Sequence, residues 1–329
     1  MPANLIDKAA IKELAAKAAG LDNDQGEPRL KEVLNRLLYD VMVAIDDLDV
    51  SMNEFWSAIA YIGEAAKANE LGLVVPGTAL EHFLDLRLDE AERRAGLGGG
   101  TTRTIEGPLY VAGAPLVKGE ARLDDDTDES EIPRQPLRLS DLVGGHKRSP
   151  TVLFMDGQVF DIAGNPVAGA IVDVWHANSF GFYSFFGPPQ SPYNLRRRIE
   201  TDREGRYRFR SIMPSGYGCP PGSNTEQLLT KLGRHGQRPA HIHFFVTSPG
   251  YRQLTTQINI DGDKYLHDDF AFGTRNDLIP PVERVSNAQE IHKAGLIKPF
   301  ARIRFDFRLT RETAGAPSTV VHREHAVAA

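Results

Sequence analysis

The chain is poor in cysteine and carries no excess of basic residues. Cys219 is the single cysteine among 329 residues, so neither an intrachain disulfide nor a zinc site built from paired cysteines can form. One cysteine suits a reducing compartment, and we expect a cytoplasmic protein. The 44 Asp and Glu residues outnumber the 38 Lys and Arg residues, which gives a formal net charge of −6. This balance argues against nucleic acid as a partner, because phosphate binding calls for a basic surplus or stripe.

Long apolar runs and an export signal are also missing. No segment approaches the roughly 18 uninterrupted apolar residues of a membrane span, and residues 1–8 do not combine a basic stretch with an apolar core. We therefore expect neither export nor membrane spanning. The one concentrated basic run, Arg196-Arg197-Arg198, is followed by Glu200 and Asp202, which favours a solvated loop over a nucleic-acid contact.

The first 100 residues carry helical patterns. Ser51-Met52-Asn53-Glu54 has the spacing of a capping box, so a helix should begin there. Another helix is expected over residues 78–95, before the Gly98-Gly99-Gly100 run. Residues 29–46 carry a stripe of apolar side chains at helical spacing: Leu30, Val33, Leu34, Leu37, Leu38, Val41, Met42 and Ile45. We expect residues 1–100 to form an all-helical domain, within which this stripe can pack.

From residue 101 the pattern changes to short β-rich segments separated by turn sequences. Asp261-Gly262-Asp263 is one such turn. The predicted strands are residues 152–160, 169–175, 206–210, 241–247, 254–260 and 303–309. Many short strands in series predict an antiparallel β-sandwich over residues 101–312, so the fold is mainly β with α. Residues 313–329, rich in Ala, Thr and Ser, should form a flexible tail.

A histidine pair stands in the predicted strand at residues 241–247. His241 and His243 share one face of that strand, while Ile242 points to the other. Each histidine alone is more often an ordinary polar residue, but two imidazoles on one face form a natural half of a metal site. Residues 244–248 offer no carboxylate, which disfavours an iron(II) site of two histidines and one carboxylate.

Oxygen ligands would then come from tyrosines. Composition does not choose among the candidates, which are Tyr183, Tyr193, Tyr207, Tyr217, Tyr251 and Tyr265. Tyrosines usually serve as packing residues with a paired hydroxyl. Tyr217 differs because it lies between two glycines in a loop bracketed by Pro214 and Pro221, an unusual place for a packing residue.

Several motifs, in order, resemble those of the intradiol ring-cleaving dioxygenases, in particular the subgroup that acts on catechol. The motifs are Ile105 to Pro115, Trp175-His176-Ala177-Asn178, Tyr183-Ser184-Phe185-Phe186, Asn194-Leu195-Arg196-Arg197-Arg198, Pro214-Ser215-Gly216-Tyr217-Gly218-Cys219 and Gly233 to His243. The resemblance extends from the N-terminal helices to about residue 310, and each expected ligand position is filled.

The resemblance implies one iron(III) ion per subunit, held by Tyr183, Tyr217, His241 and His243. Phenolate oxygens suit a hard ferric ion, whose charge can pull a phenol from its usual pKa of ~10 to full ionisation at neutral pH. Tyr217 would be the axial ligand that leaves when substrate binds and accepts one of its protons. The implied reaction cleaves catechol with O2, between the two oxygen-bearing carbons, to cis,cis-muconate.

The resemblance also implies roles around the metal. Arg238 would stabilise negative charge on the substrate ring, and Gln257 would donate a hydrogen bond; a structural ion pair and a satisfied polar residue are the alternative readings. An apolar pocket would be formed by Leu73, Pro76, Ile105, Pro108, Leu109, Cys219, Phe270 and Ala271. Of these, Leu73 and Leu109 favour unsubstituted or methylated catechol because bulky aliphatics meet the edge of the ring.

The N-terminal helices have a further implied role. In the resembled family they form a homodimer with a hydrophobic tunnel that holds phospholipid, and a long apolar stripe such as that at residues 29–46 rarely stays exposed. We expect a homodimer. Two rival functions stay open at this point: a dioxygenase for chlorocatechol or hydroxyquinol, and a non-enzymatic β-sandwich binding module with a vestigial site. The intact ligand positions disfavour the binding module.

Overall fold

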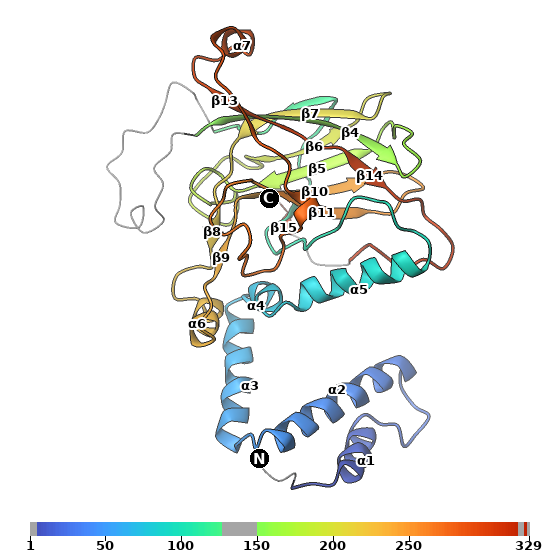
Figure 1. The fold of residues 1–329 in the computed structure, drawn as a ribbon. Coiled ribbons are helices and arrows are strands. Elements are labelled where there is room, and N and C mark those ends of the chain that lie inside the picture. Colours follow the sequence, from blue (N-terminus) through green and yellow to red (C-terminus); the bar gives the residue numbers. More distant parts are fainter. Residues whose placement is uncertain (1–4, 127–149, 322–325, 328–329) are drawn as a thin grey trace. The chain divides into compact units, whose positions relative to one another are not determined.

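A computed structural model describes residues 5–126, 150–321 and 326–327 (Figure 1). The chain divides into two compact units, Met1–Asn69 and Glu70–Ala329. No helix in these described ranges combines the length and apolarity that a membrane span requires. The domain limits drawn from the sequence at residues 100 and 312 remain predictions.

The first unit is helical, as predicted. It contains α1 (Lys8–Ala18), α2 (Pro28–Asp47) and α3 (Met52–Lys67). The capping box at the start of α3 is confirmed: the Ser51 hydroxyl accepts from Glu54 N–H at 3.3 Å, and the Glu54 carboxylate accepts from Ser51 N–H at 2.9 Å. These two bonds satisfy backbone donors that the first helical turn leaves free.

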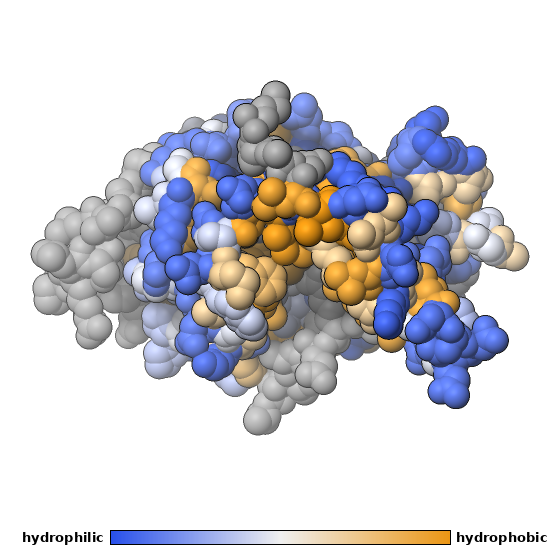
Figure 2. Space-filling view, turned by 90° about the horizontal axis from the view of Figure 1, so that it is seen from below, coloured by the Kyte–Doolittle hydropathy of each residue, from blue (hydrophilic) through white to orange (hydrophobic). Residues whose placement is uncertain are grey.

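Much of the apolar stripe of α2 is left uncovered by its own unit, although Leu38, Met42 and Ile45 are half-buried. No residue of α2 is buried, and five apolar side chains of the stripe are exposed: Leu30, Val33, Leu34, Leu37 and Val41. Figure 2 shows hydrophobic side chains gathered over the face that it views. The sequence-based expectation that the stripe packs inside the helical region is therefore wrong for this face of α2.

The helix predicted over residues 78–95 is confirmed as α5 (Leu80–Arg94), and a short helix that was not predicted, α4 (Leu71–Gly77), precedes it. The break falls at Ala79, whose φ of 64° is left-handed and cannot continue a right-handed helix. Both helices belong to the second unit, where α4 carries two of the predicted pocket residues, Leu73 and Pro76.

Two β-sheets form the body of the second unit (Figure 1). The five-stranded sheet has the order β11-β10-β5-β6-β2. Its strands are β2 (Leu116–Lys118), β5 (Ile171–His176), β6 (Arg196–Glu200), β10 (His241–Thr247) and β11 (Leu254–Asn259). The six-stranded sheet has the order β12-β13-β4-β7-β3, with β14 also paired to β4. Its strands are β3 (Glu120–Arg122), β4 (Val152–Asp161), β7 (Arg206–Ile212), β12 (Glu283–Val285), β13 (Phe300–Arg304) and β14 (Phe307–Leu309).

The main hydrophobic core lies between these sheets. Met155 and Phe209 of the six-stranded sheet share one buried cluster with Val174, Ile242 and Phe244 of the five-stranded sheet. The predicted β-sandwich is confirmed, but its strand pairing is mixed. The β2–β6, β3–β7, β13–β4 and β14–β4 pairs are parallel, because these strands reach their partners from distant parts of the chain and not through hairpins.

The strand predicted over residues 303–309 is interrupted. Phe305 accepts a hydrogen bond from the Tyr207 hydroxyl at 2.8 Å through its carbonyl, and the Asp306 carboxylate accepts from Gln158 N–H at 2.9 Å. These contacts draw the chain out of the ladder, so β13 ends at Arg304 and β14 begins at Phe307.

The basic run at residues 196–198 is not a solvated loop. It lies in β6, and Arg196 is buried. Its guanidinium donates to the Ser184 hydroxyl at 2.8 Å and the Ser184 carbonyl at 3.2 Å, while Arg197 pairs with Asp125 at 2.5 Å. These partners make the burial of Arg196 and the partial burial of Arg197 tolerable.

Part of the tail at residues 313–329 is held to the domain. The Arg252 guanidinium donates to the Pro317 carbonyl at 2.6 Å, and β15 (Ala326–Val327) pairs in parallel with β1 (Val111–Ala112). The expected flexible tail is thus anchored at these described points. The remaining short elements are β8 (Tyr217–Gly218), β9 (Gln237–Arg238), α6 (Asn224–Lys231), a 3-10 helix (Asn276–Leu278) and α7 (Ala288–Lys293).

Candidate metal centre

The Nε2 atoms of the two histidines in β10 face each other. His241 Nε2 lies 3.0 Å from His243 Nε2, and both side chains are buried. His241 Nδ1 lies 2.6 Å from the Pro239 carbonyl, so Nδ1 carries the proton and Nε2 keeps its lone pair. That assignment leaves the Nε2 atom as a donor for a metal ion.

Both predicted tyrosines reach the same place from different loops. The hydroxyls of Tyr183 and Tyr217 each lie 3.5 Å from His241 Nε2, and their rings meet edge to face with centroids 5.4 Å apart. Ser215 N–H donates to the Asn178 carbonyl at 3.1 Å, which ties the loop before Tyr217 to the loop before Tyr183. The structure therefore brings all four predicted ligands together.

The glycines around Tyr217 explain its unusual loop. In β8, Tyr217 pairs with Arg238 of β9 and Gly218 pairs with Gln237. A side chain at Gly216 would come within 2.5 Å of the Arg238 carbonyl, and one at Gly218 within 2.4 Å of the Gln237 side-chain amide. At Gly216 the obstacle is backbone, so only glycine permits this close approach, which aims Tyr217 at the histidines.

The donor set fits a hard metal ion. Ligands that each lie about 2 Å from a common ion are themselves about 3–4 Å apart, and the distances around His241 Nε2 are 3.0 and 3.5 Å. Two phenols and two imidazoles offer oxygen and nitrogen donors suited to iron(III). Among the described residues, no three His, Cys, Asp or Glu gather to form another candidate site. Without the tyrosine oxygens, the two histidines alone would not supply enough ligands for a metal site.

Burial sets the protonation of the donors in the metal-free protein. Desolvation, and then the nearby Arg238 charge, lower the pKa of His241 to about 3, and burial with His241 lowers the pKa of His243 well below its usual range. Both imidazoles are neutral at pH 7 and free to bind a metal. Burial raises the pKa of Tyr183 well above its usual value, so a bound cation would be needed to ionise this phenol.

Two buried arginines border the cluster. The Arg196 guanidinium lies 5.7 Å from the centre of the Tyr183 ring; burial lowers the pKa of Arg196 to about 10, which still leaves it charged at neutral pH. Arg238 NH1 lies 3.1 Å from His241 Nε2. Burial disfavours the charged form of Arg238, but the attraction of the Asp269 carboxylate outweighs this effect, so the pKa of Arg238 is raised. Positive charge on both sides favours anionic groups at the cluster.

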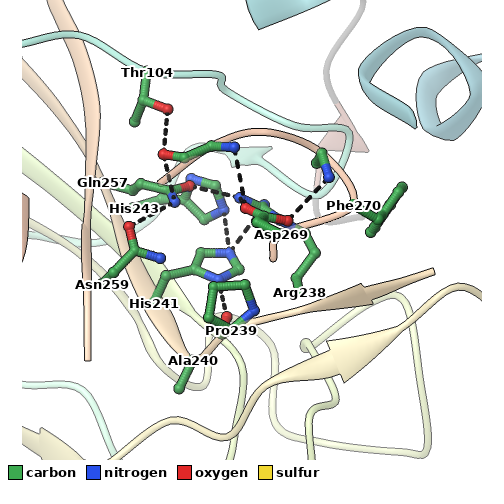
Figure 3. A network of polar contacts seen from close by, with 12 residues as sticks. Thr104, Arg238, Pro239, Ala240, His241, His243, Gln257, Asn259, Asp269 and Phe270 are labelled. Carbon is green, nitrogen blue, oxygen red and sulfur yellow. Dashed lines mark hydrogen bonds and ion pairs between the residues drawn. The ribbon is translucent and has the colours of Figure 1, made fainter. Parts of the chain in front are cut away.

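Arg238 is also the centre of a hydrogen-bond network (Figure 3). Its NH2 group donates to Asp269 at 3.0 Å and to the Gln257 side-chain oxygen at 2.9 Å. Gln257 stands opposite His243 in the β10–β11 ladder, so the two side chains share one face. Arg238 therefore forms the ion pair of the structural reading and also lies beside the candidate ligands, and its role toward a substrate remains a prediction.

The predicted pocket residues fall into neighbouring groups. Ile105, Cys219, Phe270 and Ala271 share one buried cluster, while Leu109 packs against the cluster that contains Tyr183. Helix α4 lies against the segment that contains Pro108 and against the segment that contains Phe270. A side chain at Gly72 would come within 3.0 Å of Pro108, and one at Gly77 within 3.5 Å of Phe270. Helix α4, which carries Leu73 and Pro76, thus adjoins the other predicted pocket residues. The role of Leu73 and Pro76 as substrate contacts remains a prediction.

Asp269 and Trp175 are neighbours of the centre to which sequence reasoning gave no role. Asp269 could have been suspected, because a buried Arg238 requires a counter-ion and Asp269 directly precedes the predicted pocket residue Phe270. Trp175 begins the motif Trp175-His176-Ala177-Asn178, but only the β5–β10 register, in which Trp175 pairs with His243, reveals its contact.

Comparison with known proteins adds independent information. A family model described as dioxygenase matches residues 105–311, and a model described as the catechol dioxygenase N terminus matches residues 27–96. Catechol 1,2-dioxygenase 2 of Acinetobacter lwoffii is 52% identical over 289 residues, which cover 88% of this chain and 96% of that protein. Chlorocatechol 1,2-dioxygenase of Rhodococcus opacus is 34% identical over 72% of this chain and 83% of that protein.

A solved structure agrees over nearly the whole chain. The crystal structure of wild-type Acinetobacter radioresistens catechol 1,2-dioxygenase matches with a TM-score of 0.88 and 47% identity, and covers 99% of this chain and 100% of that chain. The match includes the strands and loops that bring the two tyrosines to the two histidines. From the family models, the sequence identity and the shared fold we conclude that this chain belongs to the intradiol dioxygenase family.

Proposed function

We propose that this chain is an iron(III)-dependent enzyme that cleaves catechol with O2 to cis,cis-muconate. The observation that carries this function is the convergence of two phenol oxygens, from Tyr183 and Tyr217, on His241 Nε2, which itself faces His243 Nε2. One iron ion per chain fits these four donors. Iron(III) would supply the Lewis acidity that holds both catechol oxygens and the redox chemistry that lets the bound ring react with O2.

Tyr217 is the proton acceptor in this mechanism. Tyr183 is 2% exposed, whereas Tyr217 is only half-buried, so Tyr217 has the freedom to turn away when a diol enters. Its phenolate oxygen takes one catechol proton, and the neutral phenol is then no longer attracted electrostatically to a cation. Tyr183, enclosed beside Arg196, stays in place.

Arg238 stabilises the negative charge of the bound substrate. Its guanidinium is buried, is fixed by Asp269 and lies 3.1 Å from His241 Nε2. A fixed cation in a site that excludes water acts more strongly than one in solvent and needs no rearrangement during the reaction. The amide nitrogen of Gln257, predicted to donate in the pocket, donates to Asn259 and to the Gly273 carbonyl, each at 3.2 Å. Its oxygen accepts one Arg238 N–H at 2.9 Å, and Gln257 thus helps to orient the guanidinium toward the ring.

The pocket selects a flat, mostly apolar ring. Leu73 and Leu109 meet the edge of that ring and favour unsubstituted or methylated catechol over bulkier substrates. Phe270 and Ala271 form a buried wall with Ile105 and Cys219. Such a lining offers few polar groups besides the metal and Arg238.

The decisive experiment is aerobic incubation of the iron-loaded protein with catechol while the ultraviolet absorption of muconate is followed. Parallel reactions with 4-chlorocatechol and hydroxyquinol determine which diol gives the highest kcat/KM; we expect catechol. A binding module with a vestigial site would form no product from any of the three diols. It would also be colourless, whereas tyrosinate bound to iron(III) absorbs visible light.

The protein acts as a cytoplasmic homodimer joined through its N-terminal helices. The exposed apolar side chains of α2, such as Leu30 at 59% and Leu37 at 57%, support this assembly, because a stripe of this kind is rarely left in water. Phospholipid would occupy the apolar space between the subunits. Light scattering at micromolar protein should give twice the mass of the chain, and a monomeric mass would contradict the dimer. Lipid extraction followed by mass spectrometry tests for the phospholipid.

A further inference from the structure

We propose that Asp269 is a positioning residue that holds the Arg238 guanidinium against the candidate metal centre, and that Gly273 leaves the space which this position requires. The activity readout of this inference rests on the function proposed above. The position of the guanidinium can be measured without iron and without substrate.

Asp269 grips Arg238 from one side with both carboxylate oxygens. Oδ1 accepts from Arg238 Nε at 3.1 Å, and Oδ2 accepts from NH2 at 3.0 Å. The side chains of Arg238 and Asp269 are only 4% and 1% exposed. This two-point contact fixes the plane of the guanidinium as well as its location, and it directs NH1 toward His241 Nε2 at 3.1 Å.

Asp269 is itself held by the turn in which it lies. Oδ1 accepts from Ala271 N–H at 3.0 Å, and Oδ2 accepts from Gly273 N–H at 3.1 Å. The carboxylate therefore cannot turn to follow a displaced arginine. Its negative charge is also the counter-charge that a buried guanidinium needs. An asparagine would present an N–H₂ group to donors and would lose at least one of these contacts.

Gly273 packs closely against the side chains of Arg238 and Gln257. A side-chain carbon at this position would lie 2.5 Å from Arg238 NH2 and 3.1 Å from Gln257 Nε2. The Gly273 carbonyl also accepts from the Thr104 hydroxyl at 2.8 Å and from Gln257 Nε2 at 3.2 Å. Even one methyl group would thus push the guanidinium out of place while every charged group is kept.

The same turn also carries Phe270 and Ala271, which lie in the apolar cluster with Ile105 and Cys219. One short segment therefore sets both the wall of the predicted pocket and the position of its nearest fixed cation. Because a misplacement of about 1 Å can lower a rate about 100-fold, the turn is suited to align the ring of the substrate with Arg238.

The first test compares Asp269→Asn with Glu92→Gln. Glu92 pairs with Arg252 at 2.6 Å in a similarly buried ion pair, in which the Glu92 side chain is 10% and the Arg252 side chain 3% exposed. We expect Asp269→Asn to lower kcat per bound iron about 10- to 100-fold, with a smaller change in KM. The Glu92→Gln variant should lose comparable thermal stability but keep kcat within about twofold. Equal losses of kcat in both variants would show a general folding effect and overturn the proposal.

The second test uses glycines and leaves all charges in place. Gly273→Ala should lower kcat per iron about as much as Asp269→Asn, whereas Gly98→Ala should not, because nothing lies within 4 Å of a side chain at Gly98. This variant keeps the proposal testable if Asp269→Asn does not fold. Unchanged kcat in Gly273→Ala would refute the required clearance.

The third test is independent of turnover. In the metal-free protein, the Arg238 Nε–H signal in a nitrogen-15 NMR spectrum, assigned with Arg238→Gln, should exchange slowly with water. The exchange rate should rise at least about tenfold in Asp269→Asn and stay unchanged in Glu92→Gln. Rapid exchange in the wild type would contradict the positioning role even if catechol turnover is observed. Slow exchange without any turnover would sustain the positioning role and count against the proposed function instead.

Discussion

Trp175 lies flat against His243, with ring centroids 4.9 Å apart and an interplanar angle of 4°. The two residues are partners in the antiparallel β5–β10 ladder, which places their side chains on one face. Tyr110 and Phe245 pack against the indole at 4.9 and 4.7 Å. Among the described residues, His243 Nδ1 has no hydrogen-bond partner, in contrast to His241 with its Pro239 carbonyl. The indole therefore orients the His243 ring where a hydrogen bond does not.

Replacing Trp175 by leucine should loosen the metal centre. Neighbours that orient a metal-binding histidine typically contribute 10- to 100-fold in metal affinity, and we expect a loss of about tenfold in competition with a chelator. Loss of the buried ring should also cost about 3 kcal/mol of unfolding free energy, measured by urea denaturation. Trp56→Leu is the matched control, since Trp56 is 58% exposed. Wild-type iron affinity in Trp175→Leu would disprove the orienting role.

Tyr217→Phe should weaken activity and shift the visible colour while iron is retained. The remaining phenol, Tyr183, keeps one tyrosinate-to-iron transition, but the proton acceptor for catechol is gone. Absorption spectra and iron content measured on the same sample check both effects. The control is Tyr207→Phe, which removes a buried hydroxyl bonded to the Phe305 carbonyl at 2.8 Å, outside the four-donor cluster. An unchanged spectrum in Tyr217→Phe would refute its assignment as a ligand.

The local pattern predicted much of the fold but not its long-range geometry. Alternation along residues 241–247 gave a strand with the same bounds as β10 and placed both histidines on one face. The neighbours of that strand, including Trp175, depend on a register that no local pattern encodes. The parallel strands and the break at Phe305–Asp306 likewise depend on contacts between distant segments.

The candidate site shows the same division. Motif resemblance selected Tyr183 and Tyr217, which composition alone could not distinguish from four other tyrosines. Asp269 was missed because it stands 31 residues from Arg238, and its place beside the predicted pocket residue Phe270 was the one signal that could have indicated it. Burial of Arg196 was missed for a related reason: its partner Ser184 lies in a separate loop.

Leu73→Ala should change the preference among diols. If Leu73 meets the edge of the ring, its truncation makes room for a substituent, and a few methylene groups of space are worth about tenfold or more in discrimination. We expect kcat/KM for 4-chlorocatechol relative to catechol to rise about tenfold. Leu71→Ala on the same helix, where Leu71 is 41% exposed, should leave the ratio unchanged. An unaltered ratio in Leu73→Ala would remove this residue from the pocket.

Asp85 should make stability depend on pH. Burial, and then the nearby Glu81, raise the pKa of this carboxyl to about 7. Because the pKa of Asp85 is higher in the folded state, the contribution of this carboxyl to the free energy of unfolding is fully present below its unfolded pKa near 3.8. That contribution is lost as pH rises through about 7. Asp85→Asn should therefore exceed the wild type in unfolding free energy by on the order of 1 kcal/mol at pH 8, with a smaller difference at pH 4.

Thermal denaturation at several pH values checks this expectation. Asp261→Asn, at an exposed turn position, provides the control and should follow the wild type throughout. Parallel pH profiles for the wild type and Asp85→Asn would show that Asp85 does not titrate in this range.

The most direct measurement is anomalous X-ray scattering at the iron edge from crystals of the iron-loaded protein. The arrangement of Tyr183, Tyr217, His241 and His243 predicts a single strong peak per chain, about 2 Å from each of the two phenol oxygens and two Nε2 atoms. A peak beyond bonding distance of either tyrosine, or no peak between the histidines, would contradict the proposed metal centre.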